Sequence, residues 1–105
     1  MKYQILTAAL LAAFSASVMA NEKAIQSGSE LAQVKGCIGC HGMDGIGIGP
    51  TFPNLAGQHS SYLVEQLRHY RSGYRPNAIM AGQATNLTDA EIFDLASYYA
   101  SKPAP

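Results

Sequence analysis

The stretch Cys37-Ile38-Gly39-Cys40-His41 decides how the rest of this sequence is interpreted. It holds the only two cysteines of a 105-residue chain, three positions apart, and a histidine directly follows the second. A helical turn that carries residues i and i+3 presents both side chains on the same side. We therefore expect the two thiols to face one shared partner, with the imidazole of His41 beside them.

This spacing is the attachment pattern of c-type haem, and the chemistry explains each position. Each thiol adds across one haem vinyl group to form a thioether, so two sulfur atoms are needed at neighbouring edges of one macrocycle. The adjacent imidazole then lies under the ring and donates a nitrogen to the iron. The sequence predicts one haem, attached covalently through Cys37 and Cys40, with His41 as an axial ligand of its iron.

Three other interpretations of the cysteines are weighed against haem. A thioredoxin-like dithiol has the same spacing but follows a strand, and no strand pattern precedes Cys37. A structural zinc site needs four ligands; the motif supplies three, and His59 or His69 would have to complete the set. A disulfide between Cys37 and Cys40 would close a very short loop and would constrain little.

The residue on the far side of the ring determines what the haem can do. Met80 lies far from the motif in a stretch between two expected helices, whereas Met43 comes only two residues after His41 and cannot reach the opposite face. A thioether opposite an imidazole raises the reduction potential and leaves no iron position open for substrate. Met80 is the predicted sixth ligand, and His59 or His69 would replace it in a bis-histidine site.

The first twenty residues have the features of a secretory signal peptide. Lys2 supplies a positive charge, residues 5–14 are apolar except for one threonine, and the three residues ending at Ala20 fit the small-x-Ala cleavage pattern. The apolar run covers residues 5–20 at most, fewer than the ~20 of a membrane-spanning helix, although a retained anchor is the alternative. We expect cleavage after Ala20 and a mature domain, residues 21–105, in the bacterial periplasm.

The charge balance narrows the class of partner. The chain has 7 basic and 7 acidic residues; loss of Lys2 with the signal peptide would leave 6 against 7, a net charge of −1. A dedicated nucleic-acid binder would carry a basic excess, so no nucleic-acid partner is expected. Weak long-range steering favours brief encounters with redox proteins through a small, mostly apolar patch.

Three helices separated by long loops are expected. The first begins with a capping box, Ser27-x-x-Glu30, and the second opens near Ser60 and stops at Gly73. The third begins with a capping box, Thr88-x-x-Glu91, and ends at Pro103. The glycine- and proline-rich stretch 42–55 and the stretch 73–86 are expected to be irregular. No alternating run of strand length occurs in the sequence, so the fold class is all-α, with one small domain built around the haem.

Five short segments resemble class I c-type cytochromes. They are Cys37 to Gly42, Pro53 to Gly57, Met80-Ala81, Leu87 to Asp89, and Tyr98 to Ala100. Within residues 55–67 the sequence resembles the small bacterial c553-type group, or one half of a dihaem c4-type protein. The resemblance covers nearly the whole mature chain. It implies a compact helical fold around one haem, with His41 and Met80 axial, and an electron-shuttling role.

Three further residues are assigned to the haem site. The resemblance implies that a proline carbonyl after the motif accepts a hydrogen bond from the proximal imidazole, which fixes its tautomer. Pro53 occupies the matching place, and Pro50 is the alternative. Arg71 and Arg75 are candidates for pairing with a haem propionate, since a guanidinium suits a carboxylate; a solvated basic face at a helix end is the alternative.

Taken together, the sequence predicts a soluble, monomeric one-electron carrier between respiratory or oxidoreductase partners, in peripheral contact with membrane redox complexes. Such a protein makes and breaks no substrate bond. One rival is a haem enzyme, which would need Met80 off the iron and a nearby acid or base, for which only His59 or His69 is available. The other rival is a haem domain fixed as a subunit of a larger oxidoreductase.

Overall fold

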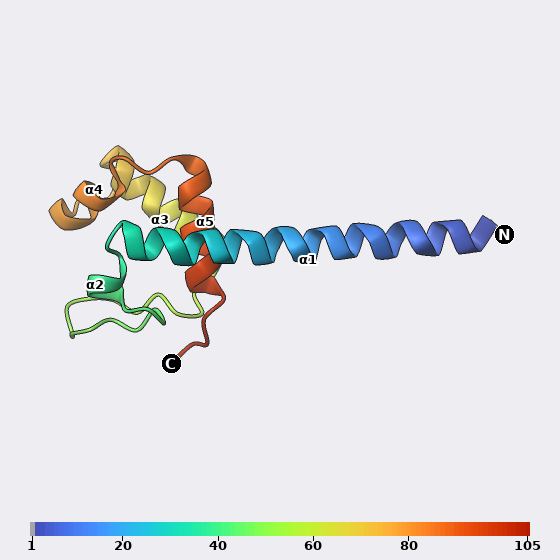
Figure 1. Ribbon diagram of the computed structural model, residues 1–105. Coiled ribbons are helices and arrows are strands. Elements are labelled where there is room, and N and C mark those ends of the chain that lie inside the picture. The colour runs from blue at the N-terminus through green and yellow to red at the C-terminus, as the bar shows by residue number, and fades with distance from the viewer. Residues whose placement is uncertain (1) are drawn as a thin grey trace.

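The computed structural model describes residues 2–105, with side chains from residue 15 onward. This part of the chain forms helices only, without a strand, which confirms the all-α prediction (Figure 1). The helices are α1 (Lys2–Val34), α2 (Ile38–His41), α3 (Ser60–Ser72), α4 (Ala78–Ala84) and α5 (Asp89–Ala100). Helix α5 packs against both α1 and α3, and α3 packs against α4.

Helix α1 begins far upstream of the expected start. It runs without a break over 33 residues, so Ser27 lies inside it and the predicted capping box at Ser27 is wrong as a helix start in this chain. Residues 2–26 contain no glycine or proline, so nothing interrupts the helical hydrogen bonding before Ser27, and a cap acts only where a helix begins. Figure 1 shows the N-terminal part of α1 extending away from the other helices.

Among the described residues, no helix combines the length and the hydropathy that crossing a bilayer requires.

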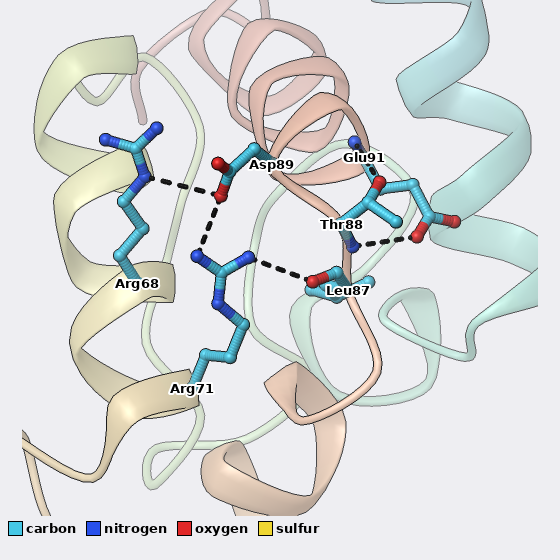
Figure 2. A network of polar contacts seen from close by, with 6 residues as sticks. All are labelled: Arg68, Arg71, Leu87, Thr88, Asp89 and Glu91. Atoms are coloured by element: carbon cyan, nitrogen blue, oxygen red, sulfur yellow. Dashed lines mark hydrogen bonds and ion pairs between the residues drawn. The ribbon is translucent and has the colours of Figure 1, made fainter.

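The two other expected helices are confirmed. Helix α3 ends at Gly73, whose φ of 83° is the left-handed conformation that glycine adopts most easily. Helix α5 begins with the predicted capping box: the Glu91 amide donates to Thr88 Oγ1 at 3.1 Å, and the Thr88 amide donates to Glu91 Oε1 at 3.0 Å (Figure 2). The sequence signals at both helix ends therefore act as expected.

The expectation that residues 73–86 are irregular is wrong for the seven residues of α4. Asn77 caps this helix, since its Oδ1 accepts a hydrogen bond from the Met80 amide at 2.9 Å. Three of the seven residues are alanine, which has the highest helix propensity. A helix of two turns is too short to show a recognisable apolar period in the sequence. Met80 thus lies on a helix rather than in a loop.

Helices α1 and α5 cross with their backbones in close contact. Gly28 is buried there, and a Cβ at this position would lie 2.0 Å from the carbonyl oxygen of Asp94 and 2.7 Å from Cβ of Tyr98. Glycine lowers the stability of a helix when it lies in the interior. Its presence at position 28 is explained by the crossing, since only a residue without a side chain lets the two backbones approach so closely.

Replacing Gly28 by alanine is expected to destabilise the domain by about 3 kcal/mol, because the new methyl group overlaps the backbone of α5 and the helices must separate. Denaturant unfolding of the haem-containing protein measures the effect. Gln26→Ala, at an exposed position on the same helix, is the control and should change stability little. Equal stability of the Gly28→Ala variant and the wild type would contradict this crossing.

Candidate functional site

The Cys-x-x-Cys-His motif forms one helical turn, as the sequence predicts. Cys37 precedes α2, and its carbonyl oxygen accepts from the His41 amide at 2.9 Å and from the Cys40 amide at 3.3 Å. Both cysteines are half-buried, and they are not joined to each other by a disulfide. Before haem is attached, burial is the main cause that raises the pKa of the Cys37 thiol above its ordinary value. One helical turn therefore carries both cysteines and His41.

The side chain of His41 is held by one hydrogen bond. It is 8% exposed, and its Nδ1 lies 2.9 Å from the carbonyl oxygen of Pro53. A carbonyl can only accept, so Nδ1 carries the proton and Nε2 has the free lone pair. Nε2 has no hydrogen-bond partner among the described residues. The imidazole is therefore in the tautomer that an Nε2-bound metal requires, and the carbonyl beside it belongs to Pro53, not to Pro50.

The Pro53 carbonyl is presented by a loop with its own internal hydrogen bonds. The carbonyl of Gly45 accepts from the amides of Leu55 at 2.7 Å and Ala56 at 3.0 Å. Next to the proline, the side chain of Asn54 accepts from the Gly47 amide at 2.8 Å. A loop without regular secondary structure thus satisfies its polar groups locally and holds one shape.

The predicted sixth ligand lies on α4. Met80 is half-buried, and Figure 1 shows α4 and α2 at the same end of the domain, away from the N-terminal part of α1. Met43 is 51% exposed. Ligation of iron by Met80 stays a prediction at this point.

Neither His59 nor His69 lies in a cluster with the motif. His59 is exposed and precedes α3, whereas the ring of His69 lies 4.7 Å from that of Tyr74 and its Nε2 lies 3.8 Å from Glu65 Oε1. Within residues 15–105 no group of three or more His, Cys, Asp or Glu side chains is placed to hold a metal ion. The zinc interpretation, which needs one of these histidines beside the cysteines, gains no support.

The two arginines assigned to a propionate have partners within the protein. Arg71 donates to the carbonyl oxygen of Leu87 at 3.0 Å and to Asp89 Oδ1 at 2.7 Å, which ties α3 to the start of α5 (Figure 2). Arg75 donates to Gln66 Oε1 at 2.7 Å and stacks 4.8 Å from the centre of the Tyr70 ring. The propionate role of both stays a prediction. The helix-joining contact of Arg71 was missed, because sequence spacing does not show which residue 16 or 18 positions away will be adjacent.

The apolar core fits an additional apolar group. Among the described side chains, Ile92 is the only large one with less than 2% exposure, while Ile48 and Ile79 are each 66% exposed. A domain this small, with so few fully buried side chains, needs something further to complete its interior. Two adjacent thiols, an imidazole with a free Nε2 and a thin core together suit a covalently attached macrocycle.

The comparisons with known proteins agree with this chemistry. Residues 25–101 match the family model for cytochrome c. The chain belongs to the cytochrome c family. It carries covalently bound haem c with its iron and falls in the c4-like group of class I c-type cytochromes, which confirms the resemblance and the cofactor prediction. Electron transfer is the role that the family and the names of the relatives support.

Two relatives and one solved structure show how far the similarity extends. Cytochrome c-554(548) of Halomonas halodenitrificans is 44% identical over 69 residues, which cover 63% of this chain and 83% of that protein. A protein of Thiomonas intermedia, named thiosulfate dehydrogenase electron acceptor, is 44% identical over 75 residues, which cover 66% of this chain and 35% of that protein. The chain thus corresponds to about a third of this longer relative.

The solved structure is the reduced recombinant cytochrome c4 from Pseudomonas stutzeri. It superimposes on 77% of this chain with a TM-score of 0.71 and 33% sequence identity. The matched region is 49% of that chain, so the similarity extends over about half of the solved protein.

Replacing Arg71 by methionine is expected to lower stability by about 1–2 kcal/mol at neutral pH, because the Leu87 carbonyl loses a charged donor. Arg68→Met is the matched control. The Arg68 side chain is 53% exposed, and its Nε lies 3.8 Å from Asp89 Oδ1, which is too far for a hydrogen bond. Its loss should therefore change stability little. Denaturant unfolding of both variants measures the difference.

The pH dependence of the Arg71 effect has a definite sign. The hydrogen bond from Arg71 is the first cause that holds the pKa of Asp89 below its ordinary 3.8, with the charges of Arg71 and Arg68 adding to it. The stabilisation from the charged carboxyl is complete above pH 3.8 and is lost as the pH falls through the lowered pKa. The stability gap between wild type and Arg71→Met should shrink in that range, and a gap that widens there would contradict the assignment.

Proposed function

We propose that this chain is a one-electron carrier whose haem iron is bound by His41 Nε2 on one side and by the Met80 sulfur on the other. The observation that carries this proposal is the bond from His41 Nδ1 to the Pro53 carbonyl, which leaves Nε2 free with the required tautomer. When bound, the haem supplies an iron that cycles between the ferric and ferrous states.

The chain's own residues would retain the haem, orient its ligand and restrict the iron to electron transfer. Cys37 and Cys40 hold the macrocycle by thioether bonds, so it is not lost outside the cell. The buried imidazole of His41 keeps its orientation because its proton is engaged by Pro53. Met80 would bind the iron through its sulfur, which would favour ferrous iron and leave no position for a substrate. Electrons can then pass through the iron, and no substrate bond is made or broken.

The partners in this proposal are redox proteins that give or take single electrons. Support comes from a relative named thiosulfate dehydrogenase electron acceptor. A net charge near −1 leaves long-range steering weak, so we propose short-lived encounters of a monomer. Because several relatives are about three times longer than the match, a fixed place in a larger oxidoreductase is the second candidate.

We further propose that residues 1–20 are a signal peptide removed on export to the periplasm. All side chains from residue 15 to residue 23 are exposed, and Ala24 is the first buried one among those described. Removal of the segment up to Ala20 therefore costs no buried side chain of residues 15–20. The family match likewise begins at residue 25, beyond the proposed cleavage point.

Mass spectrometry of the protein purified from a periplasmic fraction tests both covalent events at once. Under denaturing conditions we expect a chain that begins at Asn21 and is heavier by one haem, because thioether bonds survive unfolding. A mass that includes residues 1–20 would contradict the cleavage. A mass without the haem would contradict the attachment.

The axial ligands are tested by optical spectra and redox titration of Met80→Ala. Loss of the Met80 sulfur should abolish the weak far-red ferric band that reports sulfur ligation of the iron. It should also lower the reduction potential by on the order of 0.1–0.3 V, within the ~0.8 V range that axial ligands span. Met43→Ala is the matched control, because Met43 is exposed and lies too close to His41 in sequence to reach the other face.

Two other spectra would change the proposal. If His59→Ala or His69→Ala, rather than Met80→Ala, alters the ligand field, the site is bis-histidine. If the wild-type ferric protein is high-spin and binds cyanide rapidly, the iron has an open position and the enzyme interpretation replaces the carrier.

A further inference from the structure

Two neighbouring tyrosines near the end of α5 reach the backbone that directly follows His41. The Tyr98 hydroxyl donates to the carbonyl oxygen of Met43, and the Tyr99 hydroxyl donates to that of Gly42 at 3.4 Å. The partners are 55 and 57 residues apart in sequence. Both tyrosines are only 3% exposed, so these hydroxyls are placed in the interior.

A buried tyrosine hydroxyl has to be paired, and phenylalanine would fill the same space without that requirement. The two rings pack edge to face with their centres 4.9 Å apart, so packing alone does not need the hydroxyls. Burial is the first cause that raises the pKa of Tyr99 well above its ordinary value. Its hydroxyl therefore keeps its proton and remains a donor across the physiological pH range.

The tyrosines connect the loop to the close crossing of α1 and α5. Tyr98 lies at the α1–α5 crossing, where its Cβ is 2.7 Å from the position that a Cβ of Gly28 would take. Its ring also lies 4.7 Å from the Lys102 ammonium. The backbone of Tyr98 cannot shift without separating the two helices, so its hydroxyl is a fixed point for the Met43 carbonyl.

Helix α5 also holds the far end of the same loop. The Gly57 amide donates to the carbonyl oxygen of Tyr99 at 3.2 Å. The loop from Gly42 to Gly57 is thus attached to α5 at both ends, and Pro53 lies between these attachments. Because the loop is also braced internally, the position of the Pro53 carbonyl beside His41 depends on where α5 holds the loop ends.

We propose that Tyr98 and Tyr99 are positioning residues that tune the reduction potential by keeping the Pro53 carbonyl against the Nδ1 proton of His41. This proposal rests on the proposed function, in which His41 binds the iron. A hydrogen bond at Nδ1 makes the imidazole a stronger donor and so favours ferric iron. Loosening that bond should therefore raise the potential.

Tyr98→Phe, Tyr99→Phe and the double variant test the proposal, since phenylalanine keeps the rings and removes only the hydroxyls. Tyr74→Phe, at a site 79% exposed, is the matched control. Two quantities are measured on each haem-loaded protein: the reduction potential, and the solvent exchange rate of the His41 Nδ1 proton by NMR of the ferrous form.

We expect Tyr98→Phe to speed that exchange about fivefold, the factor for one lost buried hydrogen bond, and to raise the potential. Tyr99→Phe should act in the same direction but less, because 3.4 Å is long for a hydrogen bond from a hydroxyl, and the double variant should show the largest effect. The control should match the wild type. Asn54→Ala, which removes the brace next to Pro53 at an exposed position, should also raise the potential and gives a second test if the double variant does not fold.

The outcomes separate this proposal from the one on which it rests. If the variants melt at lower temperature but keep the wild-type potential and exchange rate, the tyrosines support only the fold and the proposal is overturned alone. If the wild-type protein itself has no reversible one-electron couple, the carrier function fails, and the positioning role fails with it. Raised potentials with faster exchange, absent in Tyr74→Phe, support the proposal.

Discussion

The hydrogen bond between His41 Nδ1 and the Pro53 carbonyl is the interaction on which the rest of the site depends. An imidazole can offer only one unprotonated nitrogen when neutral, and the carbonyl decides which one it is. With Nδ1 protonated, Nε2 is free for iron, and the ring is held in place while 92% of the residue is shielded from solvent. In the proposed function, attachment by Cys37 and Cys40 would bring the macrocycle to this spot, and the tautomer would make the neighbouring nitrogen a ligand.

The position of that hydrogen bond depends on a series of contacts that begins in α1. Pro53 is held by a loop that is attached to α5 at both ends, and α5 is set by its crossing with α1, where Gly28 allows backbone contact. The chain of contacts therefore runs from a glycine in the first helix to the imidazole. A fold with few fully buried side chains gains little stability from apolar packing. Directed hydrogen bonds therefore hold this loop in place.

Local signals were enough to predict the motif turn, the stop of α3 at Gly73 and the capping box that begins α5. The start of α1 could not be predicted from Ser27, because a capping box has no effect when helix-forming residues precede it. Helix α4 was missed because two turns are too few to show a period. Pro53 was assigned by resemblance, not by physics.

Contacts between distant segments left no trace in the sequence. The hydroxyls of Tyr98 and Tyr99 meet carbonyls more than fifty positions away. A carbonyl acceptor has no residue-type signature at all, since every residue supplies one. The same reason hid the contact between Arg71 and Leu87.

Helix α5 connects the surface ion pairs to the loop beside His41, because each set of contacts lies at one of its ends. At its start, Arg71 and Arg68 from α3 meet Asp89, and Lys35, just after α1, lies 3.7 Å from Glu91. At its end, the two tyrosines hold the loop that carries the histidine's partner. Twelve residues of helix join these two ends. The helix that Arg71 joins to α3 at its start is therefore the same helix whose tyrosines hold, at its end, the loop that carries Pro53, so one element places both contacts.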